Sequence, residues 1–300
     1  MYMKKIYAIS IIILLIGSLS ACSNGTIKSE KENIKASKII VASSIVPEST
    51  FIKAVGGDLV QVITMIPPGN SPTNYQPTPK LMEKFSKAKL YFSIGVPTEK
   101  ANILPRAEEL SDSMKIVHLE DDVRKVYKDR EFSEGKRDPH IWLSPKRVIV
   151  MINTIEKNLS DLDTKHKDIY KKNANEYIDK LKKLDSEIRD SLKNLPNKTF
   201  IVYHPSFGYF ADDYGLNMIA LERNGKKATP KVIEETIELA KKNNIKVIFY
   251  QAEIDSSQTN IIANEIKGKS EMIEPLAQNY IENLEKTAKI FKQVLGIDKK

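Results

Sequence analysis

The alternation of short apolar runs with helix-patterned segments constrains the fold of this chain most strongly. From Lys38 onward, runs rich in β-branched residues alternate with segments whose apolar residues recur every three or four positions. This alternation is typical of α/β layering with parallel strands. The predicted strands cover residues 39–44, 60–66, 89–94, 115–117, 200–203, 217–221, 246–250 and 271–273.

Predicted helices fill the intervals between these strands. Proline or glycine marks the start or end of several of them, where a fixed φ or a missing side chain suits a helix end. One interval differs, because residues 120–137 are charged and nearly devoid of apolar anchors. We expect an exposed loop there. The predicted helices cover residues 48–55, 78–88, 99–110, 144–159, 163–193, 207–214, 231–243, 256–267 and 279–295.

The longest helical pattern opens at Asp163 and ends near Lys193. About thirty residues at 1.5 Å each make a rod of about 45 Å, longer than one small lobe needs. We therefore expect residues 163–195 to link an N-terminal lobe, 38–162, to a C-terminal lobe, 196–300. A coiled-coil dimer arm is the alternative interpretation. The apolar stripe consists of Tyr170, Ala174, Tyr177, Leu181, Leu184 and Ile188.

The first 22 residues have the features of an export signal. Lys4 and Lys5 precede an apolar stretch over 6–19 that is short for a membrane span, and small residues lead to Cys22. This pattern resembles a bacterial lipobox, which predicts a lipidated Cys22; an uncleaved anchor is the alternative. Residues 23–37 are polar and predict a flexible tether. We expect a lipid-anchored protein on the extracytoplasmic face of the cell membrane.

The charge pattern argues against a nucleic-acid partner. The chain carries a formal net charge of +8, but its lysines alternate with glutamates along the predicted helices. Such alternation is typical of solvated helix faces. Neither an arginine cluster nor a basic patch interleaved with aromatic residues is present in the sequence.

Three residues whose side chains can bind a metal lie beside proline at the ends of apolar runs. His140 lies in Asp138-Pro139-His140-Ile141-Trp142-Leu143-Ser144-Pro145, His204 in Tyr203-His204-Pro205, and Glu274 in Ile273-Glu274-Pro275. His204 and Glu274 each follow a predicted strand, so both belong to the edge of the sheet where ligands bind in α/β proteins. If the lobes face each other, the three side chains converge. Two imidazoles and a carboxylate suit a divalent transition metal.

Each of these residues also has a structural interpretation. A histidine after a strand can be a hydrogen-bonded loop residue, and Glu274 can be a surface group or the partner of a helix N-terminus. We expect the other two histidines, His118 and His166, to be structural or exposed.

The chain resembles the metal-binding lipoproteins of bacterial zinc and manganese ABC importers over its mature length. The matches are Cys22, Pro68-Gly69-Asn70-Ser71-Pro72, Tyr75-Gln76-Pro77-Thr78-Pro79, Ile94-Gly95 with Glu99, the His140 block, His204-Pro205-Ser206-Phe207-Gly208-Tyr209-Phe210 with Tyr214-Gly215-Leu216, and Glu274-Pro275-Leu276 with Tyr280. The resemblance implies two Rossmann-like α/β lobes joined by one long rigid helix, with the metal between them. It also implies that His140 and His204 are ligands, and that an ABC permease and its ATPase are partners.

Two positions depart from the family pattern. Glu274 stands where the family usually has an aspartate, and Thr73 stands where it has its first histidine. The fourth ligand is then water, Asn74, the second oxygen of Glu274, or Glu99. The 120–137 segment also lacks the histidines that zinc-binding members often carry there. Zinc, manganese and ferrous iron all remain open as the metal, with zinc first and manganese as the alternative.

Three hypotheses follow for the function. The first is a monomeric binding protein that captures Zn²⁺ or Mn²⁺ and delivers it to a permease, with cell adhesion as a secondary role. The second keeps the fold but binds a metal chelate or a small organic ligand, because of Thr73. The third is a metal-dependent enzyme; the sequence offers no nucleophile elbow or phosphate loop for it, so we expect no enzymatic activity.

Overall fold

The computed structural model describes residues 38–110, 113–222, 226–253 and 257–296. The predicted signal segment, the tether and the lipidation site Cys22 lie outside these residues. Within the described ranges, no helix combines the length and apolar character that crossing a membrane requires.

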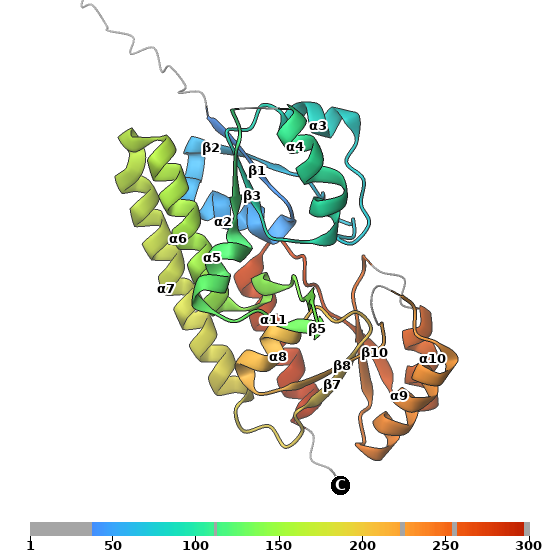
Figure 1. Cartoon of the computed structure of the whole chain (residues 1–300). Coiled ribbons are helices and arrows are strands. Elements are labelled where there is room, and N and C mark those ends of the chain that lie inside the picture. The colour runs from blue at the N-terminus through green and yellow to red at the C-terminus, as the bar shows by residue number, and fades with distance from the viewer. Residues whose placement is uncertain (1–37, 111–112, 223–225, 254–256, 297–300) are drawn as a thin grey trace, which may run out of the picture. The chain divides into compact units, whose positions relative to one another are not determined.

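The N-terminal lobe is a four-stranded parallel sheet flanked by helices (Figure 1). Its strand order is β2-β1-β3-β4. The strands are short. The two central ones, β1 and β3, are mostly buried, as expected for parallel strands that helices cover on both faces, whereas the edge strands β2 and β4 are mostly part-buried or exposed. The elements are β1 (Ile39–Ser43), α2 (Val46–Gly56), β2 (Val60–Thr64), α3 (Pro79–Phe85), β3 (Leu90–Ser93), α4 (Leu104–Leu110) and β4 (Lys115–His118).

The C-terminal lobe repeats this plan with the strand order β10-β9-β7-β8, again all parallel. Two four-stranded parallel sheets confirm the predicted α/β fold class. Because the strands are parallel, their carboxyl ends meet at one edge of each sheet. The elements are β7 (Thr199–Val202), α8 (Gly208–Tyr214), β8 (Asn217–Ala220), α9 (Pro230–Lys242), β9 (Val247–Tyr250), α10 (Ser257–Glu265), β10 (Lys269–Met272) and α11 (Tyr280–Leu295).

One long helix, α7 (Lys167–Leu192), runs along both lobes beside α6 (Pro145–Leu162) (Figure 1). Its 26 residues span about 39 Å. It packs on α2 and α6 of the first lobe and on α11 of the second. The apolar stripe is therefore buried within this chain, and the coiled-coil alternative is wrong. Of the predicted stripe, Tyr177 is only partly buried, and Ile178 and Leu192 are buried in addition. The buried residues of this helix are Tyr170, Ala174, Ile178, Leu181, Leu184, Ile188 and Leu192.

The apolar interior consists of two cores of unequal size, and the larger one extends through both lobes. One core runs from the first sheet, past α7, to the face of the second sheet that α11 covers, where Phe291 stacks against Phe200 and Phe249. A smaller core, which includes Ile201, Ile248 and other residues, lies under α9 and α10. The second lobe therefore shares one sheet face with the rest of the molecule.

The prediction of an exposed loop over residues 120–137 is wrong for the first part of this segment. Leu119–Val126 forms helix α5, whose Leu119 and Val123 are buried and lie four residues apart on one face. Acidic residues occupy its first turn and basic residues its last, which complements the helix dipole. Two apolar anchors at helical spacing are thus enough here. The remainder forms a mostly exposed hairpin of β5 (Glu131–Ser133) and β6 (Lys136–Arg137).

Candidate metal site

His140 is held in place by the acid two residues before it. The backbone N–H of His140 donates to Asp138 Oδ1 at 3.0 Å, and the ring Nδ1 lies 2.7 Å from the same oxygen. After the histidine, a 3₁₀ turn (Ile141–Leu143) leads to Ser144, whose hydroxyl caps helix α6. The imidazole is 7% exposed, so its direction is set by the Asp138 contact and by packing.

His204 follows strand β7 at the carboxyl edge of the second sheet. Its Nδ1 lies 3.0 Å from Glu222 Oε2, and Glu222 follows the neighbouring strand β8 at the same edge. Both side chains are nearly buried. Each lobe thus contributes one imidazole, and each imidazole has its Nδ1 on a carboxylate.

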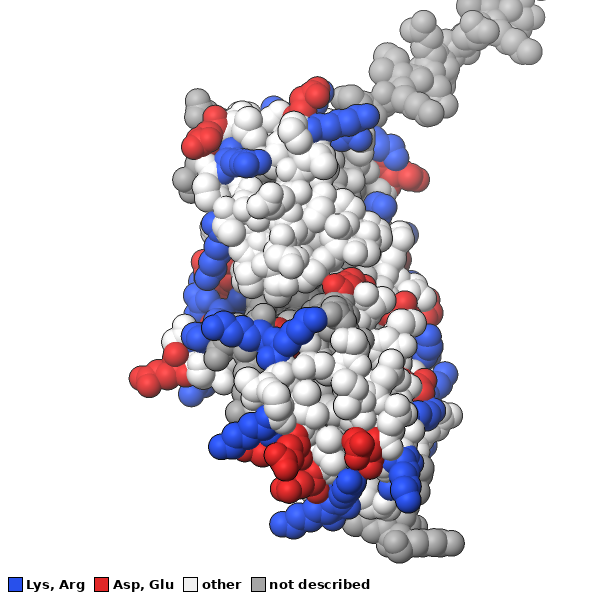
Figure 2. Space-filling model, turned by 90° about the vertical axis from the view of Figure 1, so that its right-hand side faces the viewer, with Lys and Arg blue, Asp and Glu red and all other residues white. Residues whose placement is uncertain are grey.

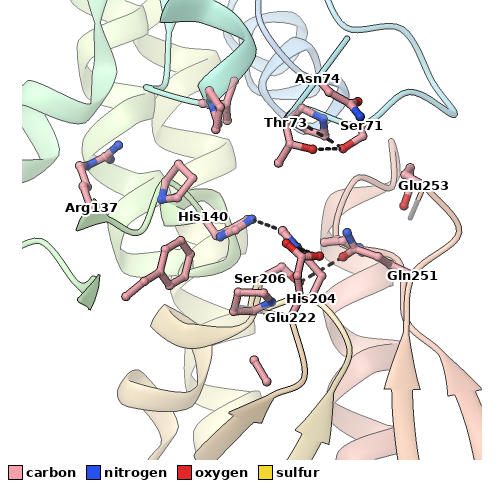
Figure 3. A pocket seen from close by; sticks show the side chains of 18 of the residues that line it. Ser71, Thr73, Asn74, Arg137, His140, His204, Ser206, Glu222, Gln251 and Glu253 are labelled. Carbon is pink, nitrogen blue, oxygen red and sulfur yellow. Dashed lines mark hydrogen bonds and ion pairs between the residues drawn. The ribbon is translucent and has the colours of Figure 1, made fainter. Parts of the chain in front are cut away.

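The remaining ring nitrogens face each other across the cleft (Figure 3). His140 Nε2 and His204 Nε2 are 3.3 Å apart, and the two rings meet edge to face. A carboxylate can only accept, so each Nδ1 carries the ring proton and each Nε2 presents a lone pair. Two lone pairs at this distance repel unless a proton or a cation lies between them.

Burial favours the neutral form of the first imidazole. It lowers the pKa of His140 below the ordinary value, although the Asp138 carboxylate opposes the shift. A neutral imidazole with a protonated Nδ1 is the form that binds metal through Nε2. A carboxylate behind a ligating histidine also fixes the ring and raises its basicity.

The Nε2 separation fits a tetrahedral metal. Two zinc–nitrogen bonds of about 2.0–2.1 Å that meet at the tetrahedral angle place their nitrogens about 3.3–3.4 Å apart. The two lobes hold the nitrogens 3.3 Å apart. The separation of the two nitrogens therefore matches one edge of a zinc tetrahedron.

A cavity of about 1640 Å³ opens around the two imidazoles. Thr73 and Asn74 line its wall from the first lobe, facing Gln251 and Glu253 from the second (Figure 3). The Thr73 hydroxyl lies 2.5 Å from the hydroxyl of Ser71. The lining of this part of the cavity thus includes hydroxyl, amide and carboxylate side chains.

Glu274 follows β10 at the expected sheet edge, but its carboxylate is not in this cavity. Glu274 lines an adjoining cavity of about 210 Å³, and its Oε2 lies 3.7 Å from Lys286 Nζ. The backbone around it is fixed, since Asn283 Nδ2 donates to the Glu274 carbonyl and the Trp142 indole N–H donates to the Pro275 carbonyl. The structure brings His140 and His204 together, but not Glu274 with them. Across the described ranges, no three His, Cys, Asp or Glu side chains cluster closely enough to enclose a metal.

Glu99, the other candidate carboxylate, lies inside the first lobe. Its oxygens accept from the N–H groups of Ile94, Gly95 and Val96 and from the Ser44 hydroxyl. Burial raises the pKa of Glu99 to about 7. These bonds hold the turn after β3, which is a structural role.

The two other histidines pair with nearby side chains, as expected of structural residues. His118 Nδ1 lies 2.8 Å from the Ser93 hydroxyl, and His166 Nδ1 lies 2.6 Å from Asp163 Oδ2.

Sequence reasoning missed the partner of His204. Glu222 directly follows the segment 217–221 that we predicted as a strand, so a carboxylate at the sheet edge was visible in the sequence. The strand order that makes β8 the neighbour of β7 was not visible. Asp138 was noted only as part of the His140 block.

A family model matches most of the chain. The model described as ZnuA, zinc-uptake complex component A, periplasmic, matches residues 41–294. The chain belongs to the zinc-uptake complex component A family. It is accordingly the substrate-binding component of a zinc or manganese ABC importer, and it is a transport protein, not an enzyme.

Members of this family with different metals resemble the chain to a similar degree. The manganese ABC transporter substrate-binding lipoprotein PsaA of Streptococcus mitis is 28% identical over 273 residues, which cover 88% of this chain and 87% of PsaA. The zinc-binding lipoprotein AdcA of Streptococcus pneumoniae (strain ATCC BAA-255 / R6) is 28% identical over 299 residues, 92% of this chain and 58% of AdcA. Because the two identities are equal, they do not indicate whether this chain binds zinc or manganese.

Solved structures of the family superpose well on this fold. The crystal structure of ZnuA matches with a TM-score of 0.81 and 32% identity, covering 86% of this chain and 99% of that one. The laminin-binding protein Lmb of Streptococcus agalactiae, described as a bifunctional protein with adhesin and metal transporting activity, matches with a TM-score of 0.75 at 24% identity, covering 86% of this chain and 99% of Lmb. At that identity the match concerns the fold alone.

Proposed function

We propose that this protein captures Zn²⁺ outside the cell and holds it between His140 Nε2 and His204 Nε2. The observation that carries the proposal is the 3.3 Å separation of the two nitrogens, which matches an edge of a zinc tetrahedron. Mn²⁺ is the alternative metal. It prefers oxygen ligands in octahedral geometry, which two closely spaced imidazoles favour less.

The remaining parts of the proposal concern delivery of the metal. Cys22 carries the lipid anchor, residues 23–37 form the tether, and the two lobes hand the metal to an ABC permease driven by its ATPase. The names of the lipoprotein relatives support this placement. Glu274 as a third ligand stays a prediction of the sequence alone, and the position of its carboxylate outside the histidine cavity argues against it. Cell adhesion as a second role also stays a prediction.

Calorimetric titration of the metal-free full-length protein tests the metal. We expect one Zn²⁺ per chain, with Mn²⁺ binding at least about tenfold more weakly. Tight Mn²⁺ with weaker Zn²⁺ would keep the transport class and overturn the choice of metal. If neither ion bound, the histidine pair would not be a metal site.

A further inference from the structure

Arg130 connects the carboxylate behind His140 to the second lobe. Its Nη1 donates to Asp138 Oδ2 at 3.2 Å, and its Nε lies 3.2 Å from Asp212 Oδ2 on helix α8. Asp138 is fully buried, whereas Asp212 is exposed. One guanidinium thus bridges a buried carboxylate of the first lobe and an exposed carboxylate of the second.

The two oxygens of Asp138 have separate partners. Oδ1 accepts from the backbone N–H of His140 and lies 2.7 Å from its Nδ1, and Oδ2 accepts from Arg130. A charge-assisted hydrogen bond to one oxygen of a carboxylate restricts the rotation of the whole group. The Arg130 contact therefore fixes the plane of the carboxylate that orients the His140 ring.

The backbone of the same segment is attached to helix α8 through Tyr209. The Tyr209 hydroxyl accepts from the Arg130 N–H at 2.9 Å and donates to the Asp138 carbonyl at 3.1 Å. Helix α8 begins at Gly208, shortly after His204 in the chain. The helix that follows one imidazole thus also holds the arginine and the aspartate behind the other.

The glycine at the start of α8 leaves room for this guanidinium. A Cβ built on Gly208 would lie 2.7 Å from Arg130 Cζ, Nε and Nη1. That distance is well inside the optimal carbon–carbon separation of about 3.5–4.0 Å. A side chain at position 208 would therefore push the guanidinium away from Asp138.

We propose that Arg130 is a positioning residue for metal binding, which holds Asp138 in the orientation that directs His140 Nε2 toward His204 Nε2. This inference rests on the proposed function, because the direction of the ring matters only if the metal lies between the two imidazoles. Arg130 acts through Asp138 and does not contact the metal. Without this donor, Asp138 Oδ2 is a buried acceptor that turns toward other donors, and its carboxylate then orients the His140 ring less firmly.

The charge and the position of Arg130 have opposite effects on metal binding. Figure 2 shows Lys and Arg side chains gathered across the groove between the upper and lower parts of the molecule, and Arg130 is one of the cations that line the cavity. Removing a positive charge from such a wall by itself favours a bound cation. Loss of the Asp138 contact disfavours it. A substitution that tests the positioning role must therefore move the guanidinium without changing the charge of the cleft.

Gly208→Ala meets this condition, because its methyl group displaces the guanidinium and adds no charge. We expect it to weaken the Zn²⁺ affinity of the full-length protein about tenfold, the lower end of the loss for an outer-shell partner. Competition with a chromophoric chelator measures the affinity, and thermal unfolding of the metal-free protein checks the fold. In an Arg130→Gln background the same alanine should change the affinity less than about twofold, because the group that it displaces is gone.

Tyr209→Phe is a second test that changes no charge. It removes the hydroxyl that holds the Arg130 N–H and the Asp138 carbonyl, and it should weaken Zn²⁺ affinity at least about threefold. Parental affinity in both Gly208→Ala and Tyr209→Phe would overturn the positioning role and leave the metal site intact.

Arg189→Gln is the matched control for an arginine that supports α8 elsewhere. Arg189 Nη1 donates to the Asp213 carbonyl at 3.1 Å, and its Nη2 pairs with Asp185 on α7. This change should alter Zn²⁺ affinity less than about twofold. Equal losses in Arg189→Gln and Gly208→Ala, or an undiminished effect of Gly208→Ala in the Arg130→Gln background, would overturn the role of Arg130. If the parent protein bound no Zn²⁺, the proposed function would fail as well.

Discussion

The two sides of the cleft differ in how firmly they hold their potential metal ligands. On the histidine side, both imidazoles are nearly buried and each Nδ1 lies on a carboxylate, Asp138 or Glu222. On the opposite side, Thr73 contacts another hydroxyl, and the carboxylate of Glu274 lies half-exposed in a neighbouring cavity. The chain fixes its nitrogen donors before the metal arrives, whereas neither Thr73 nor Glu274 is held as an oxygen donor beside them.

This difference implies that affinity depends mainly on the fixed side. Ligands held by packing and by a second layer of hydrogen bonds lose little freedom when the metal binds. A donor that must first break a bond to another partner contributes less to the affinity for the metal. The following predictions test this comparison, from the largest effect on metal affinity to the smallest.

Removing either imidazole should abolish tight binding. His140→Ala and His204→Ala should each weaken Zn²⁺ affinity more than about 100-fold, because the loss of an outer-shell partner alone costs about 10–100-fold. Competition with a chromophoric chelator measures the affinity, and thermal unfolding of the metal-free variants checks that the lobes still fold. If both variants bound Zn²⁺ with the parental affinity, His140 and His204 would not be metal ligands.

Weakening the carboxylate behind His204 should have the next largest effect. Glu222→Gln keeps the shape but loses the charge that orients the ring and raises its basicity, so we expect about a tenfold or greater loss of Zn²⁺ affinity. Glu131→Gln removes an acid of the same cavity that does not touch either histidine. It should change the affinity less than threefold, and equal losses in the two variants would mean that only cavity charge matters.

Adding nitrogen to the opposite side should strengthen binding. Thr73→His places an imidazole on the wall that now presents a hydroxyl, and we expect about a tenfold gain in Zn²⁺ affinity. Thr73→Val removes the hydroxyl without adding a ligand and should have little effect. A tenfold loss in Thr73→Val would instead show that the hydroxyl is itself a ligand.

Glu274→Gln should change Zn²⁺ affinity less than threefold. Its carboxylate lies beside Lys286, and hydrogen bonds from Asn283 and Trp142 hold the carbonyls of Glu274 and Pro275. The same competition assay measures the effect. A loss as large as that of His204→Ala would make Glu274 the third ligand, and the opposite side of the cleft would then assemble around the metal.

Glu99→Gln should leave metal affinity unchanged and alter the pH dependence of stability. The pKa of Glu99 rises from its ordinary 4.5 to about 7 on folding, mainly through burial. Between these values the unfolded chain releases a proton that the folded chain retains. This group therefore lowers the free energy of unfolding as pH rises from about 4.5 to 7, by up to about 3 kcal/mol.

Urea unfolding of the metal-free protein at several pH values measures this slope. The Glu99→Gln variant should have a flatter slope across the window. Some slope should remain, because burial also raises the pKa of the neighbouring Glu48. An unchanged slope would contradict the assignment of the titration to Glu99.

The sequence predicted the architecture better than the site. Strand-and-helix alternation and the long apolar stripe were enough for two α/β lobes joined by α7. Those signals are local periodicities in the sequence, which arise because one face of each helix or strand is buried. The helix α5 was missed because its two anchors, Leu119 and Val123, are hidden among charges.

Side-chain direction explains what was missed in the site. His140 and His204 stand in local motifs, and the structure places their Nε2 atoms 3.3 Å apart. Glu274 also lies at the predicted sheet edge, but its carboxylate lies beside Lys286, and its backbone position depends in part on Trp142, which is distant in the sequence and donates to the Pro275 carbonyl. Spacing along the chain gives no information on such contacts.

X-ray absorption at the zinc edge of the Zn²⁺-loaded full-length protein tests the central claim most directly. We predict two imidazole nitrogens at about 2.0–2.1 Å, with oxygen donors in the remaining positions. The imidazole signal should fall to one nitrogen in His204→Ala. A spectrum of oxygen donors alone in the parent protein would contradict a metal held between His140 and His204.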